Sequence, residues 1–558
     1  MPTGMLRVWG MVCVAAMIGA CGESDPSDAA AERLEMGGAD ATQASGPTWH
    51  ADIAPVVDRT CNGCHYTGGI APFVFETYAD FSAVAAASLD AIEHGRMPPW
   101  MPDPTCRSYE DERILKPEEK ALFADWKAAG MPEGTPMERR ESAQVADAPE
   151  PDFSTSPESA YVADSSAADD YRCFVLDKTF DEDTYVQRVR IVPGDPAVVH
   201  HVLVYVVYPG DLDELMALED GEDGLGYTCF GGPRVPEFGV PSPIAGWAPG
   251  GVPIEYREGA MGYIPAGSRL VMQVHYNLIA ADPAPDLTQL EFNVYDEAQP
   301  FVVRAKPLPH LGIRIPAGER ESVHVREFEN FGNSPLSVVS TAPHMHTLGT
   351  KIRLDVVSPE TDSETCLVDI PEWDFNWQQT LVLREPVTVA PGARFRLRCT
   401  YDNSPGNQPR IDGERIEPRT VHWGDGTLDE MCLNFVGVLE PFKSYSSRCA
   451  DVTECRAQCE GDALSCALDC VTDHPDCSQC AVVSLTGEGG CIRNTCPLEL
   501  FNAADCMTNC TIESLLGGGM GRCMNSKCPA EMASLSQCME TALNDGRCQS
   551  DVDRCLVR

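Results

Sequence analysis

The uneven placement of cysteine constrains this chain more than any other feature of its sequence. Sixteen of its 26 cysteines lie between Cys449 and Arg558, and the other ten are spread over the much longer part of the chain that precedes them. Such a density is typical of small domains that disulfides hold together in an oxidising compartment. The sequence therefore predicts an exported protein that ends in a disulfide-rich domain over residues 446–558.

The cysteine-rich segment contains an internal repeat. Residues 491–507 and 523–539 carry Cys, Cys-Pro, Glu and Cys-Met in register. Cysteines one helical turn apart, such as Cys455 and Cys459, would lie on one face of a helix. We expect short helices joined by disulfides. Metal clusters are the alternative, although zinc ligand spacings are nearly absent.

The N-terminus agrees with export. Arg7 precedes an apolar run from Val8 to Ala20, which is too short for a transmembrane helix and has the proportions of a secretory signal. The run ends in Ile-Gly-Ala-Cys, which resembles the lipobox of bacterial lipoproteins. The resemblance implies that residues 1–20 are removed and that Cys21 is acylated. We predict an exported bacterial lipoprotein of the outer membrane, on its periplasmic or outward face, with an ordinary signal peptide as the alternative.

The charge balance limits the partners of the chain. It has 85 Asp and Glu against 41 Lys and Arg, a formal net charge of −44 that is spread along the sequence. An acidic surface of this kind disfavours nucleic acid and anionic lipid as electrostatic partners. We therefore expect no nucleic-acid partner.

The first part of the chain predicts a small helical domain between two polar stretches. Small polar residues over 21–48 predict a flexible tether. Helical patterns, including a helix that Pro117 opens, predict an all-α domain over 49–134. Residues 135–158 are rich in Pro, Ser and acidic residues and are interpreted as a linker.

The centre of the chain is β-rich. From Tyr161 to Glu440, short runs of β-branched and aromatic residues are separated by Pro, Gly and Asp turns. This pattern predicts two antiparallel β-sandwich domains, jelly-roll-like, over residues 159–300 and 301–445. The expected fold class is therefore multidomain, with an all-α domain, two sandwiches and a disulfide-rich helical end.

Residues 61–65 (CNGCH) form the attachment pattern of c-type haem. The thiols of Cys61 and Cys64 are placed to bond the porphyrin vinyl groups, and His65 is placed to ligate the iron. We therefore predict that residues 49–134 are a cytochrome c-like domain with one covalent haem c. A local disulfide or a zinc ligand pair is the alternative.

The second axial ligand of this haem has three candidates. The separation of Met97 from His65 is similar to that between the two axial ligands in small class I cytochromes c. A methionine opposite a histidine would raise the reduction potential. We predict Met97 as the ligand, with Met101 and His94 as the nearby alternatives.

Six residues of the β region are suited to bind metal in two sets. A regular strand would point adjacent histidines to opposite faces, so the pair at residues 200–201 needs an irregular strand entry to share an ion. An HxH pair projects to one face and can chelate. Three imidazoles hold copper in both oxidation states, whereas two imidazoles and a thioether favour Cu(I). Taken together, His200, His201, His275, His344, His346 and Met431 imply two unequal copper sites, although each histidine alone could be a surface residue and Met431 alone a core residue.

The motifs YRCFVL, VVHHVLVYV, QVHYN, HMHTLGTKI, CTYDN and LDEMCLNF occur in an order that resembles the copper type II ascorbate-dependent monooxygenases. This is the family of dopamine β-monooxygenase and peptidylglycine α-hydroxylating monooxygenase. The resemblance implies that His200, His201 and His275 hold a copper that donates electrons. It further implies that His344, His346 and Met431 hold the copper at which O2 is reduced and a C–H bond is hydroxylated. It also implies a disulfide beside the methionine, Cys399–Cys432, and Cys173–Cys229 is expected as a second bridge.

The sequence departs from the peptide-amidating branch of that family. An arginine before the HxH pair and an asparagine and a tyrosine after the methionine are replaced by Ala342, Leu433 and Phe435. A substrate carboxylate would have no charged clamp. We therefore expect a neutral or aromatic small molecule. His422 is interpreted as structural or as a neighbour of the oxygen site.

The function that we predict is that of a copper monooxygenase, which consumes two electrons for each O2. The family takes them from ascorbate, and the fused haem domain predicts a second supply that re-reduces the three-histidine copper, fed by a donor protein. One alternative is a haem and copper lipoprotein that only transfers electrons or carries copper. Another is an adhesion protein that acts through its cysteine-rich end.

Overall fold

The computed structural model describes residues 46–444 and parts of the C-terminal segment, chiefly residues 526–544. Short gaps within the first range fall at 68–70, 111, 137–148, 167–168, 230, 236–241, 250, 279–282, 412–413 and 425. The leader, Cys21 and most of the tether lie outside the described residues, so the lipid anchor stays a prediction. Among the described residues, no helix has the length and hydropathy needed to cross a membrane.

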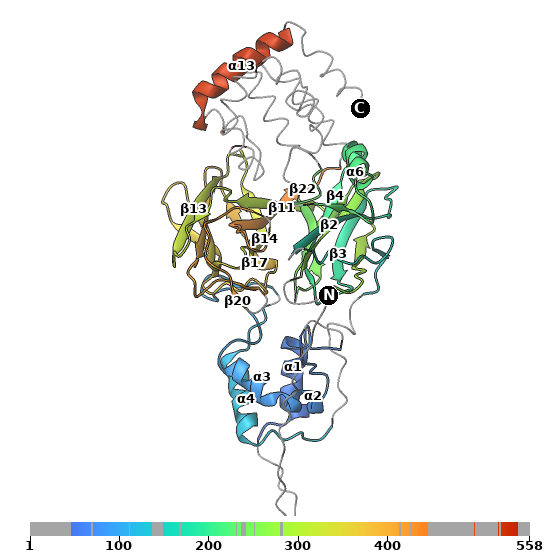
Figure 1. Ribbon diagram of the computed structural model, residues 1–558, viewed down its shortest axis with the longest axis vertical. Helices are drawn as coiled ribbons and strands as arrows, with labels where there is room; N and C mark the ends of the chain where they lie inside the picture. Colours follow the sequence, from blue (N-terminus) through green and yellow to red (C-terminus); the bar gives the residue numbers. More distant parts are fainter. Residues whose placement is uncertain are drawn as a thin grey trace, which may run out of the picture. The chain divides into compact units, whose positions relative to one another are not determined.

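The first described segment is helical. Its elements are η1 (Trp49–Ile53), α1 (Ala54–Thr60), α2 (Tyr78–Ala83), α3 (Ala85–Glu93) and α4 (Pro117–Ala128). Trp49, Phe81 and Trp126 are fully buried, and their rings lie within 5.2 to 5.9 Å of one another. Thr77 forms a capping box with Asp80 at the start of α2, which fixes the beginning of that helix. These helices can be followed in Figure 1.

Residues 100–113 lie between α3 and α4 and pack on the second β-sandwich. We call them the strap. Tyr109 is 1% exposed in the sandwich core, and its hydroxyl donates to the carbonyl of Leu367 at 2.9 Å. A disulfide joins Cys106 to Cys366, which is far away in sequence. The sequence predicts residues 49–134 as one helical domain, and the strap lies inside this range. The range therefore contributes side chains to two hydrophobic cores, that of the helices and that of the second sandwich.

The first sandwich consists of two sheets around a core that includes Phe174, Val202 and Phe292. The strand order in one sheet is β1-β10-β3-β8, with β7 also paired to β3, and in the other β5-β2-β9-β4-β6. β1 lies within the predicted linker, so the sandwich begins earlier in the chain than expected. Phe153 of β1 stacks on Phe292 of β10, with ring centroids 4.8 Å apart, and this contact holds β1 on the sandwich. The bounds are β1 (Phe153–Thr155), β2 (Asp169–Val175), β3 (Thr184–Val192), β4 (Val199–Val207), β5 (Tyr227–Thr228), β6 (Pro243–Trp247), β7 (Ile254–Glu255), β8 (Ala260–Ile264), β9 (Arg269–Asn277) and β10 (Gln289–Tyr295).

Two short helices, η2 (Pro209–Asp211) and α6 (Leu212–Glu219), follow β4. Leu215 of α6 is fully buried with Val271 and with the disulfide cysteines Cys173 and Cys229. β9 therefore has two covered faces: Met272 and its alternate neighbours face the sandwich core, whereas Val271 faces this second cluster.

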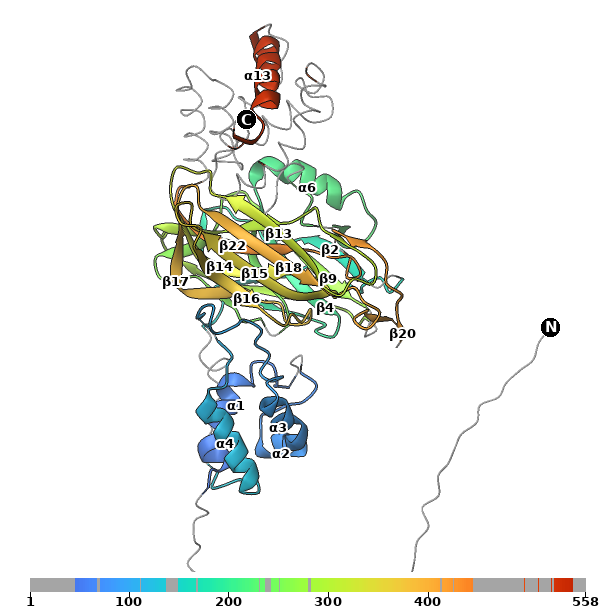
Figure 2. The ribbon, with the colours of Figure 1, turned by 90° about the vertical axis from the view of Figure 1, so that its left-hand side faces the viewer.

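The second sandwich packs the sheet β11-β22-β14-β17 against β13-β18-β15-β16 (Figure 2). Its core includes Phe328, Leu354 and Phe395, all fully buried. The bounds are β11 (Phe301–Pro309), β12 (Arg314–Ile315), β13 (Ser322–Glu329), β14 (Leu336–His344), β15 (Gly349–Val357), β16 (Glu364–Ile370), β17 (Leu381–Val389), β18 (Arg394–Tyr401), β19 (Arg410–Ile411), β20 (Glu414–Arg415), β21 (Val421–His422) and β22 (Leu433–Pro441).

One sheet runs through both sandwiches. β11 pairs antiparallel with β22 and parallel with β8, where Phe301 faces Ala260 and Val302 faces Met261. The result is a nine-stranded sheet that contains strands of both sandwiches. The expected β-sandwich architecture is present, and this parallel pairing is the addition that an antiparallel prediction missed.

The described part of the C-terminal segment contains a helix, α13 (Pro529–Asn544), which begins in the second copy of the repeat and extends beyond it. Disulfides Cys496–Cys538 and Cys510–Cys523 are present. Cys496 belongs to the first copy and Cys538 to the second, so a disulfide joins the two copies. This agrees with the prediction of helices joined by disulfides.

Candidate metal centre

The first histidine set lies where β4 and β9 pair. Val199 faces Tyr276 and His201 faces His275, so the register shifts between residues 199 and 201, and His200 is the extra residue of a β-bulge. A bulge turns two successive side chains toward the same side. The irregular strand entry that the histidine pair required is therefore present.

The bulge brings three ring nitrogens together. Nδ1 of His201 lies 3.3 Å from Nδ1 of His200 and 3.4 Å from Nδ1 of His275. One nitrogen from each ring falls within 4.8 Å of the others. His275 donates its Nε2 proton to Asp169 at 2.8 Å, which leaves its Nδ1 as an acceptor. Three converging nitrogens, one of them oriented by a carboxylate, fit a copper ion.

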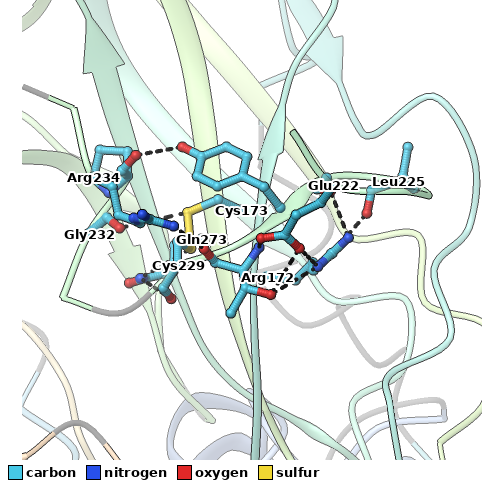
Figure 3. Close-up of a disulfide and its surroundings, with 12 residues drawn as sticks. Arg172, Cys173, Glu222, Leu225, Cys229, Gly232, Arg234 and Gln273 are labelled. Atoms are coloured by element: carbon cyan, nitrogen blue, oxygen red, sulfur yellow. Dashed lines mark hydrogen bonds and ion pairs between the residues drawn. A yellow bond between two sulfur atoms is a disulfide. The ribbon is translucent and has the colours of Figure 1, made fainter. Parts of the chain in front are cut away.

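The neighbouring strand β2 supports this set. Tyr171 stacks on His275, with ring centroids 4.0 Å apart and an interplanar angle of 9°. The next residue but one, Cys173, forms the expected disulfide with Cys229, whose carbonyl accepts from the Gln273 amide at 3.3 Å. Figure 3 shows this disulfide beside the Arg172–Glu222 ion pair. Two contacts therefore hold β9, the strand that carries His275. Tyr171 of β2 stacks on His275, and Gln273 binds the carbonyl of Cys229 beside the disulfide.

The second set lies at the end of β14. His344, the last residue of β14, pairs with Leu433 of the neighbouring strand β22, and His346 follows two residues later. The Nδ1 proton of His344 is donated to the side-chain oxygen of Gln378, and that of His346 to the carbonyl of Asp429 at 3.2 Å. Both Nε2 atoms are thereby left as acceptors. The two rings are perpendicular, with centroids 5.1 Å apart.

One buried carboxyl group, that of Glu430, binds the backbone of Met431 and that of the HMH motif. Glu430 is fully buried and accepts from the backbone N–H groups of His346 at 2.9 Å, Leu348 at 2.6 Å and Met431 at 3.2 Å. The carbonyl of Met431 accepts from the hydroxyl of Tyr401 at 2.8 Å. The backbones of Met431 and of the HMH motif therefore share one anchor.

The second expected disulfide is also present: Cys399 joins Cys432, the residue after Met431. Cys399 lies on β18, in the sheet opposite to β22. Both sulfurs are buried. The methionine is therefore flanked by a buried carboxylate on one side and a covalent cross-link on the other.

The two sets lie close together. The ring centroids of His201 and His344 are 6.1 Å apart. Phe375, from the loop between β16 and β17, stacks on His200 at 4.3 Å and lies 6.0 Å from His346. Five imidazoles and one phenyl ring therefore form a single cluster to which both sandwiches contribute.

Burial keeps these imidazoles neutral. It lowers the pKa of His200 and of His344 to about 4 and that of His346 to about 3, and it lowers the pKa of His201 and His275 well below the usual value. The cause is the loss of solvation of the charged ring, and neighbouring imidazoles add to it at most of these positions. At neutral pH the rings offer lone pairs to a metal without first releasing a proton.

The CNGCH motif follows α1. In the described part of the chain, Cys61 and Cys64 are the free cysteines. His65 donates its Nδ1 proton to the carbonyl of Phe73 at 2.8 Å and stacks on Phe75 at 4.0 Å. Burial raises the pKa of the Cys61 thiol to about 12. Two reduced thiols beside a histidine whose Nε2 is left as an acceptor fit covalent haem attachment.

The three candidates for the second axial ligand differ in their partners. The sulfur of Met101 accepts from the backbone of Asp374 at 3.1 Å, within the strap contact. His94 donates to the carbonyl of Asp90 at 2.9 Å. Met97 is half-buried after α3. The sulfur of Met101 is thus engaged elsewhere, whereas the Nδ1 bond of His94 leaves its Nε2 as an acceptor, so Met97 stays a prediction with His94 as the alternative.

Sequence reasoning missed three residues that organise the centre, namely Asp169, Gln378 and Glu430. Only Glu430 had a signal, since it precedes the metal-set methionine. Asp169 and Gln378 lie far from the histidines in sequence, and only the fold brings them into contact. His422 is exposed, and its backbone carbonyl accepts from the N–H of Glu430 at 3.2 Å, which agrees with a structural role.

Comparisons with known proteins support this interpretation in part. Residues 326–459, which include His344, His346 and Met431, match the C-terminal domain of the copper type II ascorbate-dependent monooxygenases. The chain is 25% identical over 288 residues to mouse DBH-like monooxygenase protein 1, covering 46% of this chain and 42% of that protein. With the human protein it is 24% identical over 309 residues, covering 50% of this chain and 45% of the relative.

These relatives are distant, and the chain spans less than half of the length of each. Among solved structures, a particle of infectious bursal disease virus aligns with 53% of this chain and 80% of its own, at 9% identity. Its TM-score of 0.14 is too low to support an inference about the fold. Residues 326–459 are thus similar to the C-terminal domain of the copper type II ascorbate-dependent monooxygenases, and the chain is distantly similar to the two DBH-like proteins.

Proposed function

We propose that this protein hydroxylates a C–H bond of a small, neutral or aromatic molecule with O2, using two copper ions. The observation that carries the proposal is the meeting of three converging imidazoles with the imidazoles of an HMH motif, whose backbone and that of Met431 are both bound by Glu430. A protein that only carries copper needs one site. Two unequal donor sets at close range are suited to a store of one electron beside a centre that meets O2.

The division of roles follows from the donor atoms. Bound copper would supply one-electron redox chemistry at both sets and O2 reduction at the set with the thioether. His344 and His346 hold their Nε2 atoms toward this second ion because Gln378 and Asp429 bind their Nδ1 protons. Each turnover places one oxygen atom in the substrate and one in water, with two electrons and two protons consumed.

The residues beside His344 favour an uncharged substrate. Ala342 faces Phe435, and His344 faces Leu433, on the paired strands β14 and β22. Ala342, Phe435 and Leu433 occupy the positions where the peptide-amidating branch carries Arg, Tyr and Asn. Apolar side chains there would not compensate a carboxylate for its lost hydration. A benzylic substrate is therefore preferred over a glycine-extended peptide.

The test uses the full-length protein loaded with copper, with ascorbate as reductant and ethylbenzene as a neutral probe. We expect two copper ions per chain and an alcohol that carries one atom from ¹⁸O2, with one O2 consumed per product. Benzoylglycine serves as the charged comparison and should react more slowly. Copper binding without labelled product from any benzylic probe would instead favour the carrier.

We further propose that Cys61, Cys64 and His65 hold a haem c, with Met97 as second ligand, which supplies electrons in addition to ascorbate. The support is the pair of free thiols, in a region where Cys106, Cys173 and other described cysteines form disulfides. Arg113, at the end of the strap, hydrogen-bonds the Cys64 thiol and also Gln379.

This contact suggests where the electrons arrive. Gln379 follows Gln378, which binds His344, and His344 lies 6.1 Å from His201. A hydrogen-bonded and covalent route thus leads from Cys64 to the cluster. On this route electrons from the haem would pass His344 and then His201. They would thereby re-reduce the copper of the three-histidine set.

Replacing both Cys61 and Cys64 with serine is expected to abolish covalent haem. The chain would lose its thioether bonds, and denaturing electrophoresis followed by haem staining would detect none. Copper content should stay at two ions per chain, because neither cysteine belongs to the two predicted copper ligand sets. The matched control replaces Cys106 and Cys366 with serine and should keep the haem. Haem that survives the first variant would contradict attachment at this motif.

A further inference from the structure

The strap closes one side of the second sandwich. β16 and β17 are the last strands of their two sheets, so each has an edge with unpaired backbone groups. The N–H of Asp103 donates to the carbonyl of Asp369 on β16 at 2.7 Å. The N–H of Glu110 donates to the carbonyl of Val382 on β17 at 2.8 Å. Because the strap bonds to both edge strands and is joined to β16 by a disulfide, its place on the sandwich is part of the fold.

The start of the strap reaches the HMH motif through a tryptophan. The sulfur of Met101 accepts from the backbone N–H of Asp374 at 3.1 Å. The residue before it, Trp373, is 9% exposed, and its indole N–H donates to the carbonyl of His346 at 3.3 Å. Met97, the predicted haem ligand, lies four positions before Met101. A short series of covalent and hydrogen bonds therefore joins a predicted haem ligand to a predicted copper ligand.

The end of the strap reaches the other histidine of the same motif. Arg113 hydrogen-bonds the Cys64 thiol and also the side-chain oxygen of Gln379. The neighbouring residue, Gln378, accepts the Nδ1 proton of His344. The two ends of the strap thus connect the haem-binding motif and the predicted haem ligand with the second metal set, by separate contacts within one sandwich.

We propose that the strap carries electrons from the haem directly to the second metal set, with Trp373 and Arg113 as the positioning residues of this contact. In each transfer one electron passes, Fe(II) is oxidised to Fe(III) and Cu(II) is reduced to Cu(I), and no bond is formed or broken. A donor protein returns the haem to Fe(II). The inference rests on the proposed function, because it names the place where haem electrons enter. The oxygen site then receives an electron without passage through the three-histidine set.

Entry at the three-histidine set is the alternative. Phe375 follows Asp374 and stacks on His200, with ring centroids 4.3 Å apart. This stacking is a through-space contact with the other sandwich, whereas Trp373 and Gln378 reach their histidines by hydrogen bonds. The hydrogen-bonded contacts favour the second set, and the experiment removes one set at a time.

The experiment follows the oxidation state of the haem and not hydroxylation. The full-length protein is loaded with Cu(II) without O2, the haem is reduced by a flash of light with a photosensitive reductant, and its reoxidation is recorded from its absorbance. The wild type should show a fast phase that is independent of protein concentration, as transfer within one chain requires. The paired variant His200→Ala and His201→Ala, which lacks the three-histidine set, should keep this phase. Met431→Ile, which lacks the second ion, should lose it.

Two further variants test the contact itself. Trp373→Phe keeps an aromatic ring and removes the indole N–H that binds His346, so the fast phase should be lost while both copper ions stay bound. Its haem reduction potential should equal that of the wild type, because Trp373 lies on the copper side of the contact. Arg113→Met removes the contact at the other end of the strap and should slow the same phase. The matched control is Trp247→Phe, which exchanges the same rings beside the core of the first sandwich and should reoxidise its haem like the wild type.

Two results would overturn the proposal. One is a fast phase that survives in Met431→Ile and is lost in the variant without His200 and His201, which would place the entry at the three-histidine set. The other is reoxidation in Trp373→Phe and Arg113→Met as fast as in Trp247→Phe. A chain without covalent haem would instead contradict the proposed haem supply. Haem staining detects that case beforehand, so the two failures are distinct.

Discussion

Replacing Met431 with isoleucine is expected to abolish hydroxylation while one copper ion stays bound. Isoleucine fills a similar volume, so the loss is chemical: the second set keeps two imidazoles but lacks the thioether that favours Cu(I), and it no longer retains its ion. Loss of a residue that only orients a metal ligand lowers metal affinity or activity about 10- to 100-fold. Removal of the ligand itself should therefore lower the yield of labelled product at least about 100-fold. Copper content per chain and ¹⁸O incorporation measure the two effects.

The chain offers a close control for this variant. Met345 lies between His344 and His346, is fully buried and packs in the sandwich core rather than at the metal set. Met345→Ile should cost less than about 1.5 kcal/mol of stability and should keep both copper ions and the labelled product. If Met431→Ile turned over like Met345→Ile, the assignment of the oxygen site would be wrong.

Removing the Cys399–Cys432 disulfide is expected to cost about 4 kcal/mol of unfolding free energy, from the entropy gained by an open loop of about 33 residues in the unfolded chain. The paired variant Cys399→Ala and Cys432→Ala should also bind its second copper about 10- to 100-fold more weakly, because Met431 loses its covalent neighbour. Denaturant unfolding gives the stability, and competition with a Cu(I) chelator gives the affinity.

The Cys106–Cys366 disulfide provides the comparison. Its removal should lower stability as well, since it closes a longer loop. It lies in the strap contact, away from Met431, so both copper affinities should stay at the level of the wild type. An unchanged affinity in the Cys399 and Cys432 variant would show that Glu430 alone holds the methionine in place.

The sequence predicted the donor sets because their chemistry is local. The histidine pairs and the CNGCH motif each carry their meaning within a few positions, whereas the role of Met431 was predicted from the order of the motifs along the chain. From the sequence, an irregularity at His200 could be stated only as a condition for two adjacent histidines to share an ion. Strand register depends on the partner strand and not on the residues of β4 alone. The structure supplies the register that makes adjacent histidines usable together.

What the sequence did not predict depends on packing between distant segments. β1 is three residues long, and the strap has no hydrophobic period, so neither produces a pattern. Both are ordered by burial against other elements, as Phe153 is on Phe292 and Tyr109 in the second core. The short separation of His201 and His344 has the same origin, because it depends on how two sandwiches meet.

The parallel pairing of β8 with β11 has a consequence for the history of the chain. A cut near residue 300 would leave each half with a strand whose amide and carbonyl groups face water, and such edges invite association with other chains. Either half produced alone would expose its edge where Phe301 and Val302 pair with Ala260 and Met261. Evolution would therefore be expected to move the two sandwiches as one piece and to add or remove modules only at the outer ends.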